Sequence, residues 1–121
     1  MIDVLIVDDA ESIRERIAVL LTESGQIRIV GQAGNGMDGW EAVQRLRPDV
    51  VLLDIRMPGG SGIALLENIK SHYPETTVIM LTNFDDPLYR AQCQRLGADY
   101  FLNKTLEFEK IVGTITARPA S

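Results

Sequence analysis

The sequence has little cysteine, no long apolar run and no excess of basic residues, and each shortage excludes a class of protein. The single cysteine, Cys93, cannot form an internal disulfide and is compatible with a reducing cytoplasm. No apolar run approaches the roughly 20 residues that are needed to span a bilayer. The net charge of −5 disfavours nucleic acid or an anionic membrane as a direct partner, whereas it suits a site that binds a cation.

The amino end does not resemble a secretory signal, because Met1-Ile2-Asp3 lacks a basic start and leads directly into an apolar segment. We therefore expect a cytoplasmic protein. A length of 121 residues is typical of one domain with one hydrophobic core, so a single domain over residues 1–121 is predicted.

Short apolar runs alternate with segments of helical spacing along the whole chain. Branched apolar runs predict buried strands at residues 4–7, 27–30, 50–53, 78–81 and 100–102. After each run, apolar residues recur every three or four positions, which predicts an amphipathic helix. Pro48 is expected to end the second helix, and Gly97 the fourth.

Five successive strand–helix units predict an α/β fold, a doubly wound five-stranded parallel sheet with helices on both faces. We expect the flavodoxin-like strand order 2-1-3-4-5. In such open sheets, ligands bind at the carboxyl ends of the strands. The residues that follow each strand are therefore the first candidates for a functional site.

Polar side chains follow four of the five predicted strands. Asp8 and Asp9 follow the first strand, Asp54 the third, Thr82 the fourth and Lys104 the fifth. Because parallel strands end at one edge, these side chains should converge on one crevice. Asp54 is the most telling, since an ionisable carboxylate at the end of a fully apolar strand is costly to bury without partners.

Three carboxylates in one crevice repel one another, so positive charge is needed to hold them together. Lys104 offers part of it. Mg²⁺ would offer more, because it prefers oxygen ligands and is often bound through one or two carboxylates plus a phosphoryl oxygen. The pattern therefore suits phosphorylation of an aspartate, with Asp54 as the nucleophile and with Lys104 and Thr82 holding the transferred oxygens.

These stretches resemble the receiver domains of two-component response regulators. The resemblance spans the whole chain in order, and it is carried by Leu5-Ile6-Val7-Asp8-Asp9, Leu53-Asp54-Ile55-Arg56-Met57-Pro58 with Gly62, Met80-Leu81-Thr82, and Gly97-Ala98-Asp99-Tyr100-Phe101 with Lys104. It implies a CheY-like (flavodoxin-like) fold and a role in signalling rather than metabolism. Catalysis would be confined to the domain's own phosphorylation and dephosphorylation.

The resemblance also implies residue roles. Asp54 would accept a phosphoryl group from a histidine kinase or a histidine phosphotransfer protein. Asp9 and Asp54 would bind Mg²⁺ together with the main-chain carbonyl of Arg56, and Asp8 would contribute through water. Thr82 and Phe101 would form a switch pair in which Thr82 moves to the phosphoryl group and the aromatic ring turns inward.

The output implied by the resemblance is a protein–protein surface on the fourth helix, fifth strand and fifth helix. No DNA-binding motif follows the fifth helix, so we expect a stand-alone receiver. The alternative is an amino-terminal receiver cut from a longer regulator that carries a separate effector domain.

The sequence departs from the family pattern beside the site. Thr105 follows Lys104 where the family often has proline, so a cis peptide bond is not assumed there. Asn83 follows Thr82 where a small residue is usual. Arg56 and Phe84 are bulky and lie two positions beyond Asp54 and Thr82. We hypothesise that Arg56, Asn83 and Phe84 modulate access to the phosphoryl group and slow its attack by water.

Other functions fit less well. Residues 34–39 match the spacing GxGxxG, and Asp54 lies about twenty residues beyond, as in a dinucleotide-binding fingerprint. That fingerprint belongs after the first strand, where Asp8 and Asp9 would repel a pyrophosphate. A flavin-binding module of similar architecture is also disfavoured, because no Ser/Thr-rich phosphate loop follows the first predicted strand. A hydrolase with an aspartyl nucleophile would place a second acid at position 56, which is arginine.

Overall fold

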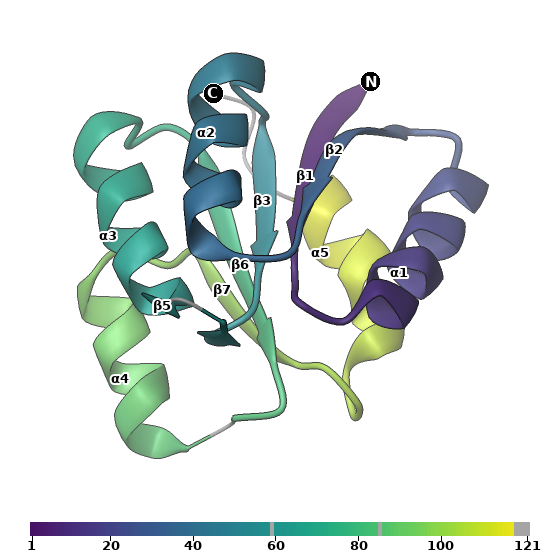
Figure 1. Ribbon diagram of the computed structural model, residues 1–121. Coiled ribbons are helices and arrows are strands. Elements are labelled where there is room, and N and C mark those ends of the chain that lie inside the picture. Colours follow the sequence, from purple (N-terminus) through teal and green to yellow (C-terminus); the bar gives the residue numbers. More distant parts are fainter. Residues whose placement is uncertain (59, 85, 118–121) are drawn as a thin grey trace.

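The computed structural model describes residues 1–58, 60–84 and 86–117 (Figure 1). The strands are β1 (Ile2–Val7), β2 (Ile27–Ala33), β3 (Val50–Leu53), β4 (Arg56–Met57), β5 (Gly60–Ser61), β6 (Thr77–Thr82) and β7 (Tyr100–Asn103). The helices are α1 (Glu11–Glu23), α2 (Gly36–Leu46), α3 (Gly62–His72), α4 (Pro87–Arg95) and α5 (Ile111–Thr116), which the short 3₁₀ helix η1 (Phe108–Lys110) precedes.

The central sheet has the order β2-β1-β3-β6-β7, and every neighbouring pair in it is parallel. Strands β6 and β7 are the fourth and fifth strands that the sequence predicts, because β4 and β5 form a separate antiparallel pair. The order 2-1-3-4-5 and the flavodoxin-like fold are therefore confirmed.

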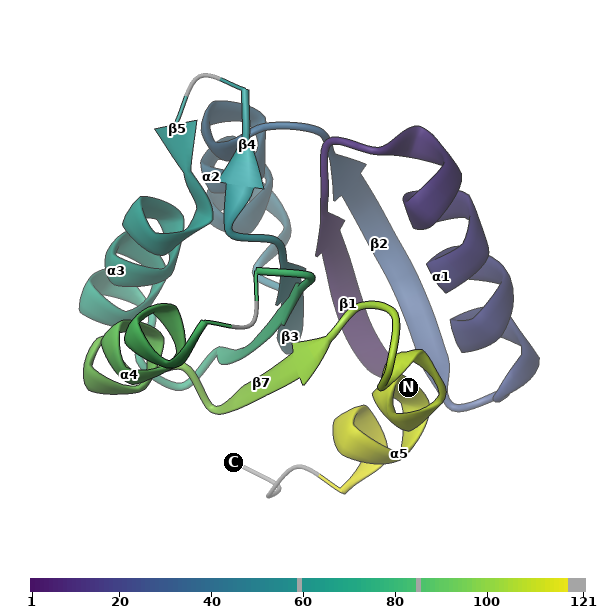
Figure 2. The same ribbon diagram turned by 90° about the horizontal axis from the view of Figure 1, so that it is seen from below.

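Helices cover both faces of this sheet. Helices α2, α3 and α4 lie on one side and α1 and α5 on the other, as the view along the sheet in Figure 2 shows. Alternate residues of each strand feed the two sides: Leu5 and Val7 of β1 join the core under α2, α3 and α4, whereas Val4 and Ile6 join the core under α1 and α5. The sheet thus separates two apolar clusters, and polar groups are left to its ends.

Some elements differ from the sequence-based expectation. The β4–β5 hairpin is not predicted, because strands of two residues are too short to show a hydrophobic period. Strand β2 runs on to Ala33, since it continues to pair with β1 as far as Val7. The predicted last helix begins as η1, and its α-helical part is only six residues long.

The glycine-rich segment 34–39 serves helix packing. Asn35 caps the start of α2, because its side-chain oxygen accepts a hydrogen bond of 2.8 Å from the amide of Asp38. A Cβ atom at Gly39 would lie 2.9 Å from the side chain of Leu65 and 3.1 Å from that of Val7. This close helix–sheet contact explains the glycine.

Among the described residues, no helix has the length and apolar content to cross a membrane.

Candidate functional site: an acidic cluster with one lysine

The sheet's own hydrogen bonding brings the predicted site residues to one edge. The amide of Asp54 donates to the carbonyl of Val7, and the amide of Asp8 donates to that of Ala33. The amide of Lys104 likewise donates to the carbonyl of Thr82 at 2.9 Å. These three residues thus extend the parallel ladder by one step, at the edge of the sheet that Figure 2 views from below.

Three carboxylates gather at this edge. One oxygen from each of Asp8, Asp9 and Asp54 lies within 4.8 Å of the others. Asp8 and Asp54 are almost completely buried, at 2% and 5% exposure, whereas Asp9 is exposed. An all-oxygen set with one open side fits a hard divalent cation such as Mg²⁺, which keeps several of its waters.

Lys104 pairs with two of the clustered carboxylates. Its Nζ lies 2.5 Å from a carboxylate oxygen of Asp8 and 2.9 Å from one of Asp54, and its side chain is 11% exposed. A single lysine therefore holds two of the three acids. With all these groups ionised, the cluster keeps an excess of negative charge, which a bound cation would offset.

The pKa shifts agree with this imbalance. Burial raises the pKa of the Asp8 carboxyl and outweighs the hydrogen bonds from Lys104 and the Ala10 amide. Burial lowers the pKa of Lys104, but the combined hydrogen bonds and charges of Asp8 and Asp54 raise it above the ordinary 10.5. The raised pKa of Asp8 disfavours the ionised Lys104–Asp8 pair, whereas the raised pKa of Lys104 favours it. Lys104 stays charged, because two carboxylates face it. Asp8 is less well compensated, because it shares Lys104 with Asp54.

The backbone around Asp54 is fixed on both sides. The amide of Ile55 donates to one carboxylate oxygen of Asp54 at 2.8 Å, and Lys104 binds the other oxygen. The amide of Gly62, at the start of α3, donates to the carbonyl of Ile55 at 2.7 Å. A Cβ atom at position 62 would lie 1.8 Å from the carbonyl oxygen of Asp54, so only glycine fits there.

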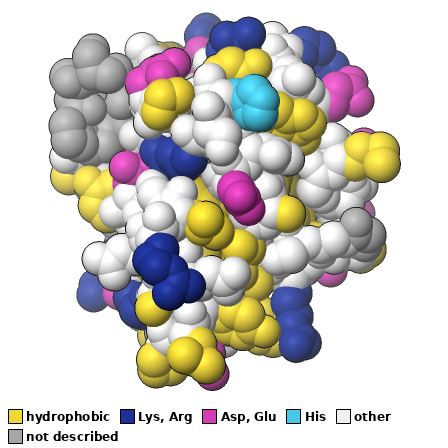
Figure 3. All heavy atoms as spheres, turned by 90° about the vertical axis from the view of Figure 1, so that its left-hand side faces the viewer, with side chains coloured by type: hydrophobic (Ala, Val, Ile, Leu, Met, Phe, Trp, Pro, Cys, Tyr) yellow, Lys and Arg dark blue, Asp and Glu magenta, His cyan; other side chains and the backbone are white. Residues whose placement is uncertain are grey.

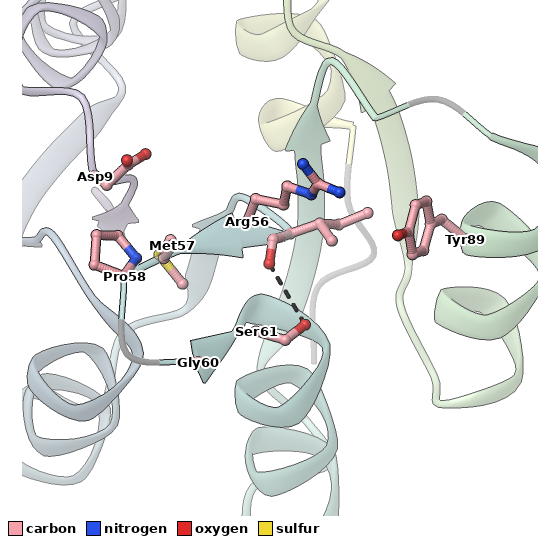
Figure 4. A pocket seen from close by; sticks show the side chains of 8 residues that line it. Asp9, Arg56, Met57, Pro58, Gly60, Ser61 and Tyr89 are labelled. Carbon is pink, nitrogen blue, oxygen red and sulfur yellow. Dashed lines mark hydrogen bonds between the residues drawn. The ribbon is translucent and has the colours of Figure 1, made fainter.

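A pocket of about 470 Å³ adjoins the acidic cluster through Asp9 (Figure 4). The β4–β5 hairpin, Arg56 and Tyr89 of α4 also line it, and Figure 4 shows Asp9 and Tyr89 on opposite sides of Arg56. The sequence does not predict the contribution of Tyr89, because its distance from Asp54 along the chain hides their closeness. Beside the antiparallel pairing of the hairpin, the Ser61 hydroxyl donates a weak hydrogen bond of 3.5 Å to the carbonyl of Ile55.

The two residues of the predicted switch pair lie on neighbouring strands, β6 and β7. Thr82 is fully buried at the end of β6, and its hydroxyl accepts a hydrogen bond of 3.1 Å from the amide of Phe84. Phe101 of β7 is half-buried against the core beneath α2, α3 and α4. The Arg90 guanidinium lies 4.5 Å from the centre of the Phe101 ring and covers its face.

The residues that depart from the family pattern make specific contacts. The guanidinium of Arg56 stacks over the Phe84 ring at 4.4 Å, so these two bulky side chains form one unit. Asn83 is exposed, and its side-chain oxygen accepts hydrogen bonds from Thr105. The described residues contain no cis peptide bond, which includes the bond between Lys104 and Thr105.

Comparison with known proteins agrees with this geometry. Residues 4–116 match the model of the response regulator receiver domain. An uncharacterized response regulatory protein of Vibrio cholerae is 40% identical over 117 residues, which cover 95% of this chain and 47% of that protein. The chain spans about half the length of the first curated relatives it matches.

Solved structures give the same result. The receiver domain of the putative response regulator NarL from Mycobacterium tuberculosis is 31% identical, with a TM-score of 0.89 and coverage of 97% of this chain and 98% of that one. A chain of the CheX–CheY–BeF3–Mg²⁺ complex from Borrelia burgdorferi is 28% identical, with a TM-score of 0.89 and coverage of 96% of this chain and 87% of that one. The chain therefore belongs to the receiver domains of two-component response regulators.

Proposed function

We propose that this receiver accepts a phosphoryl group on Asp54 in a Mg²⁺-dependent reaction with a phosphohistidine donor. The observation that carries the proposal is the cluster itself, in which Asp8, Asp9 and Asp54 converge and Lys104 contacts two of them. Receiver domains interact with histidine kinases, and the donor proposed here is such a kinase or a histidine phosphotransfer protein. Residues 1–121 act in this proposal as one receiver domain.

The residues of the chain divide the work. A carboxylate oxygen of Asp54 attacks the phosphorus atom, the bond from phosphorus to the donor imidazole nitrogen breaks, and its electron pair stays on that nitrogen. Asp9, Asp54 and the Arg56 carbonyl would hold Mg²⁺, with Asp8 acting through water. When bound, Mg²⁺ supplies positive charge that offsets that of the phosphoryl oxygens. Lys104 shifts from pairing only carboxylates to pairing a phosphoryl oxygen as well.

The stacked pair of Arg56 and Phe84 supports a long-lived phosphorylated state. Both side chains follow site residues by two positions, and the contact of 4.4 Å joins them into a cover at the pocket that Arg56 lines. Asn83, which adjoins Thr82, belongs to the same access region. In this proposal the cover hinders attack by water on phospho-Asp54. Arg56→Ala and Phe84→Ala should then each speed hydrolysis, and unchanged or slower loss of phosphate would end the idea.

The proposed output surface is the face formed by α4, β7 and α5. Figure 3 faces α3 and α4 and shows hydrophobic side chains in its lower part. Leu88 of α4 is 80% exposed, which leaves an apolar side chain for a partner protein. Phe101 of β7 would transmit the state of Thr82 to this face. Direct nucleic-acid or membrane binding is not part of the proposal, given the acidic charge of the domain.

The proposed site of action is the cytoplasm, which suits the free and buried thiol of Cys93.

The match to about half of the length of the first curated relatives favours a second form of the proposal, in which the receiver is part of a longer regulator. The receiver chemistry is the same in both forms.

The decisive experiment is phosphorylation by a small donor such as acetyl phosphate, followed by intact-protein mass spectrometry with and without Mg²⁺. One phosphoryl group should appear only with Mg²⁺, and Asp54→Asn should abolish it. A chain that stays unmodified while it binds Mg²⁺ would be a binding module without phosphotransfer. A panel of purified kinases would then identify the phosphohistidine donor by its transfer rate.

A further inference from the structure

Asn83 and Thr105, two residues that depart from the family pattern, contact each other. The Thr105 hydroxyl donates to the side-chain oxygen of Asn83 at 2.9 Å, and the Thr105 amide donates to the same oxygen at 3.1 Å. We call this pair the Asn83–Thr105 clasp. It joins the loop after β6 to the loop after β7.

The clasp lies directly beyond the two strand ends that carry site residues. Asn83 follows Thr82, and Thr105 follows Lys104. The strands already end in a main-chain hydrogen bond from Lys104 to Thr82. The clasp carries this connection one residue further, out of the sheet and into the two loops.

The two sides of the clasp are anchored differently. On the β7 side, the side-chain oxygen of Asn103 accepts from the amides of Thr105 and Leu106, at 2.9 and 2.8 Å, so the single Thr105 amide hydrogen is shared between Asn103 and Asn83. Glu107 in turn accepts from the Asn103 amide at 2.9 Å. This network holds the main chain around Thr105 in place, so Thr105 is the fixed side.

On the β6 side, the main contact is the hydrogen bond from the Phe84 amide to the Thr82 hydroxyl. Thr82 is fully buried, and its hydroxyl is oriented by that amide. Moving this hydroxyl toward a phosphoryl group on Asp54 would break the hydrogen bond from Phe84 or carry residues 82–84 along. Asn83 lies in the middle of this segment and is tied to the fixed side.

We propose that the Asn83–Thr105 clasp holds the loop after β6 in the arrangement described and opposes the movement of Thr82 toward phosphorylated Asp54. The inference rests on the proposed function of Asp54 and assigns Asn83 and Thr105 as positioning residues. Proline at position 105 would have no amide hydrogen or hydroxyl to donate, and alanine or glycine at position 83 would have no acceptor. The clasp therefore requires both departures together.

The test uses beryllofluoride, a phosphoryl mimic, titrated into the protein with Mg²⁺ and followed by amide NMR shifts. Asn83→Ala removes both hydrogen bonds and should tighten beryllofluoride binding about three- to tenfold, the range expected for exposed neutral hydrogen bonds. Thr105→Ala keeps the amide donor and should tighten it less. Thr105→Ser keeps both donors and should match the wild type.

The double variant isolates the clasp. Asn83→Ala with Thr105→Ala should bind beryllofluoride no more tightly than Asn83→Ala alone, because the shared contact is already lost. Thr114→Ala is the matched control, since it removes another exposed threonine hydroxyl, bonded at 2.8 Å to the Lys110 carbonyl of its own helical segment. It should leave binding unchanged. Thermal unfolding of each variant separates loss of the clasp from loss of the fold.

Unchanged or weaker binding by Asn83→Ala, or additive effects in the double variant, would overturn the clasp. Failure of the proposed function looks different, because the wild-type protein would then show no Mg²⁺-dependent response to beryllofluoride at all. If Asn83→Ala unfolds, Thr105→Ala and Thr105→Ser still decide between a restraining and an idle contact.

Discussion

The two ends of the parallel sheet both carry charged side chains, but their charges are matched differently. At the amino end, Asp3 pairs with Arg28 at 2.8 Å and Lys70 with Asp99 at 2.7 Å, one cation for each of these acids. At the carboxyl end, three acids cluster around one cation, Lys104, which contacts only Asp8 and Asp54. Asp3 and Asp99 each have a cation of their own, whereas the carboxyl-end cluster keeps an excess of negative charge.

The amino-end carboxylates also have a structural task. Asp99 accepts a hydrogen bond from the amide of Val78, and Asp49 accepts one from the amide of Asp3. Each carboxylate thus provides a hydrogen-bond acceptor for an amide near the start of a strand. The carboxyl-end acids Asp8 and Asp54 accept from nearby amides of Ala10 and Ile55, yet remain bound to one lysine. Charged side chains at the end of a sheet therefore indicate a functional site only where nearby amides and cations do not compensate their charge.

The largest expected effect follows from Asp54→Asn. The variant keeps the shape of the side chain but has no anionic oxygen to attack phosphorus, so phosphorylation should be lost completely. Intact-protein mass spectrometry after acetyl phosphate and Mg²⁺ measures it. Asp99→Asn, the matched change at the other end of the sheet, should leave phosphorylation unchanged. A phosphorylated Asp54→Asn protein would move the acceptor elsewhere.

Lys104→Met should have the next largest effect. It leaves two nearly buried carboxylates without their lysine, which costs on the order of 3–5 kcal/mol of folding free energy. The phosphorylation rate should fall by about 100-fold, as expected when one group that stabilises transferred charge is removed. Urea unfolding measures the folding free energy, and quenched time courses measure the phosphorylation rate. If Mg²⁺ restores stability but not rate, the catalytic role is separate from the structural one.

Mg²⁺ binding should depend on pH through Asp8. The pKa of Asp8 is raised above the ordinary 3.8, so this carboxyl takes up a proton at a higher pH than an ordinary aspartate. As pH falls through that raised pKa, Mg²⁺ affinity should drop, by about tenfold per unit at its steepest for one linked proton. Calorimetric titration across acidic pH measures it, and Asp8→Asn should flatten the profile.

The same raised pKa affects stability with a definite sign. Because folding favours the protonated form of Asp8, its ionisation destabilises the fold progressively from pH 3.8 up to the raised pKa. Lys104 acts in the opposite sense: its raised pKa stabilises the fold below pH 10.5, and this contribution is lost as pH rises through the folded-state value. Mg²⁺ should reduce the Asp8 penalty, which urea unfolding with and without Mg²⁺ would show.

Lys70→Met should have a moderate effect on stability and none on the site. Lys70 is 14% exposed in its side chain and binds the Thr76 carbonyl as well as Asp99. Loss of these contacts should cost about 1–3 kcal/mol of unfolding free energy. Phosphorylation and Mg²⁺ affinity should match the wild type. A changed phosphorylation rate would show that the two ends of the sheet are coupled.

Arg28→Ala should be the mildest change. Its partner Asp3 has a lowered pKa, chiefly through the hydrogen bond from Arg28, but the Arg28 side chain is 63% exposed and water replaces the contact. We expect no measurable loss of stability by urea unfolding at neutral pH. A clear loss would mean that charge pairs at the amino end contribute more than their exposure suggests.

Much of this structure is predictable from the sequence because its cause is local. The run from Val50 to Leu53 is apolar throughout and becomes a fully buried strand, and the acid that ends it lies at the sheet edge as expected. The convergence of Asp8, Asp54 and Lys104 follows from parallel topology. It needs only the hydrophobic pattern and the rule that parallel strands end at one edge, whereas the choice among doubly wound strand orders needs more than this pattern.

Other features depend on tertiary contacts that no local pattern reveals. The β4–β5 hairpin has two residues on each side and no period to detect. Tyr89 lines the pocket because α4 packs beside it, and Arg56 meets Phe84 across separate loops. The contact between Asn83 and Thr105 joins positions 22 residues apart. Each departure is visible in the sequence, but their pairing is not.

The close approach of Gly62 to the carbonyl of Asp54 has a mechanical consequence. The first residue of α3 is set directly against the main chain of the proposed acceptor, with no space for even one additional carbon atom. The main chain at Asp54 is therefore held in position by α3. We expect any conformational change after phosphorylation to arise from side-chain rotations and from the loops that follow the neighbouring strands.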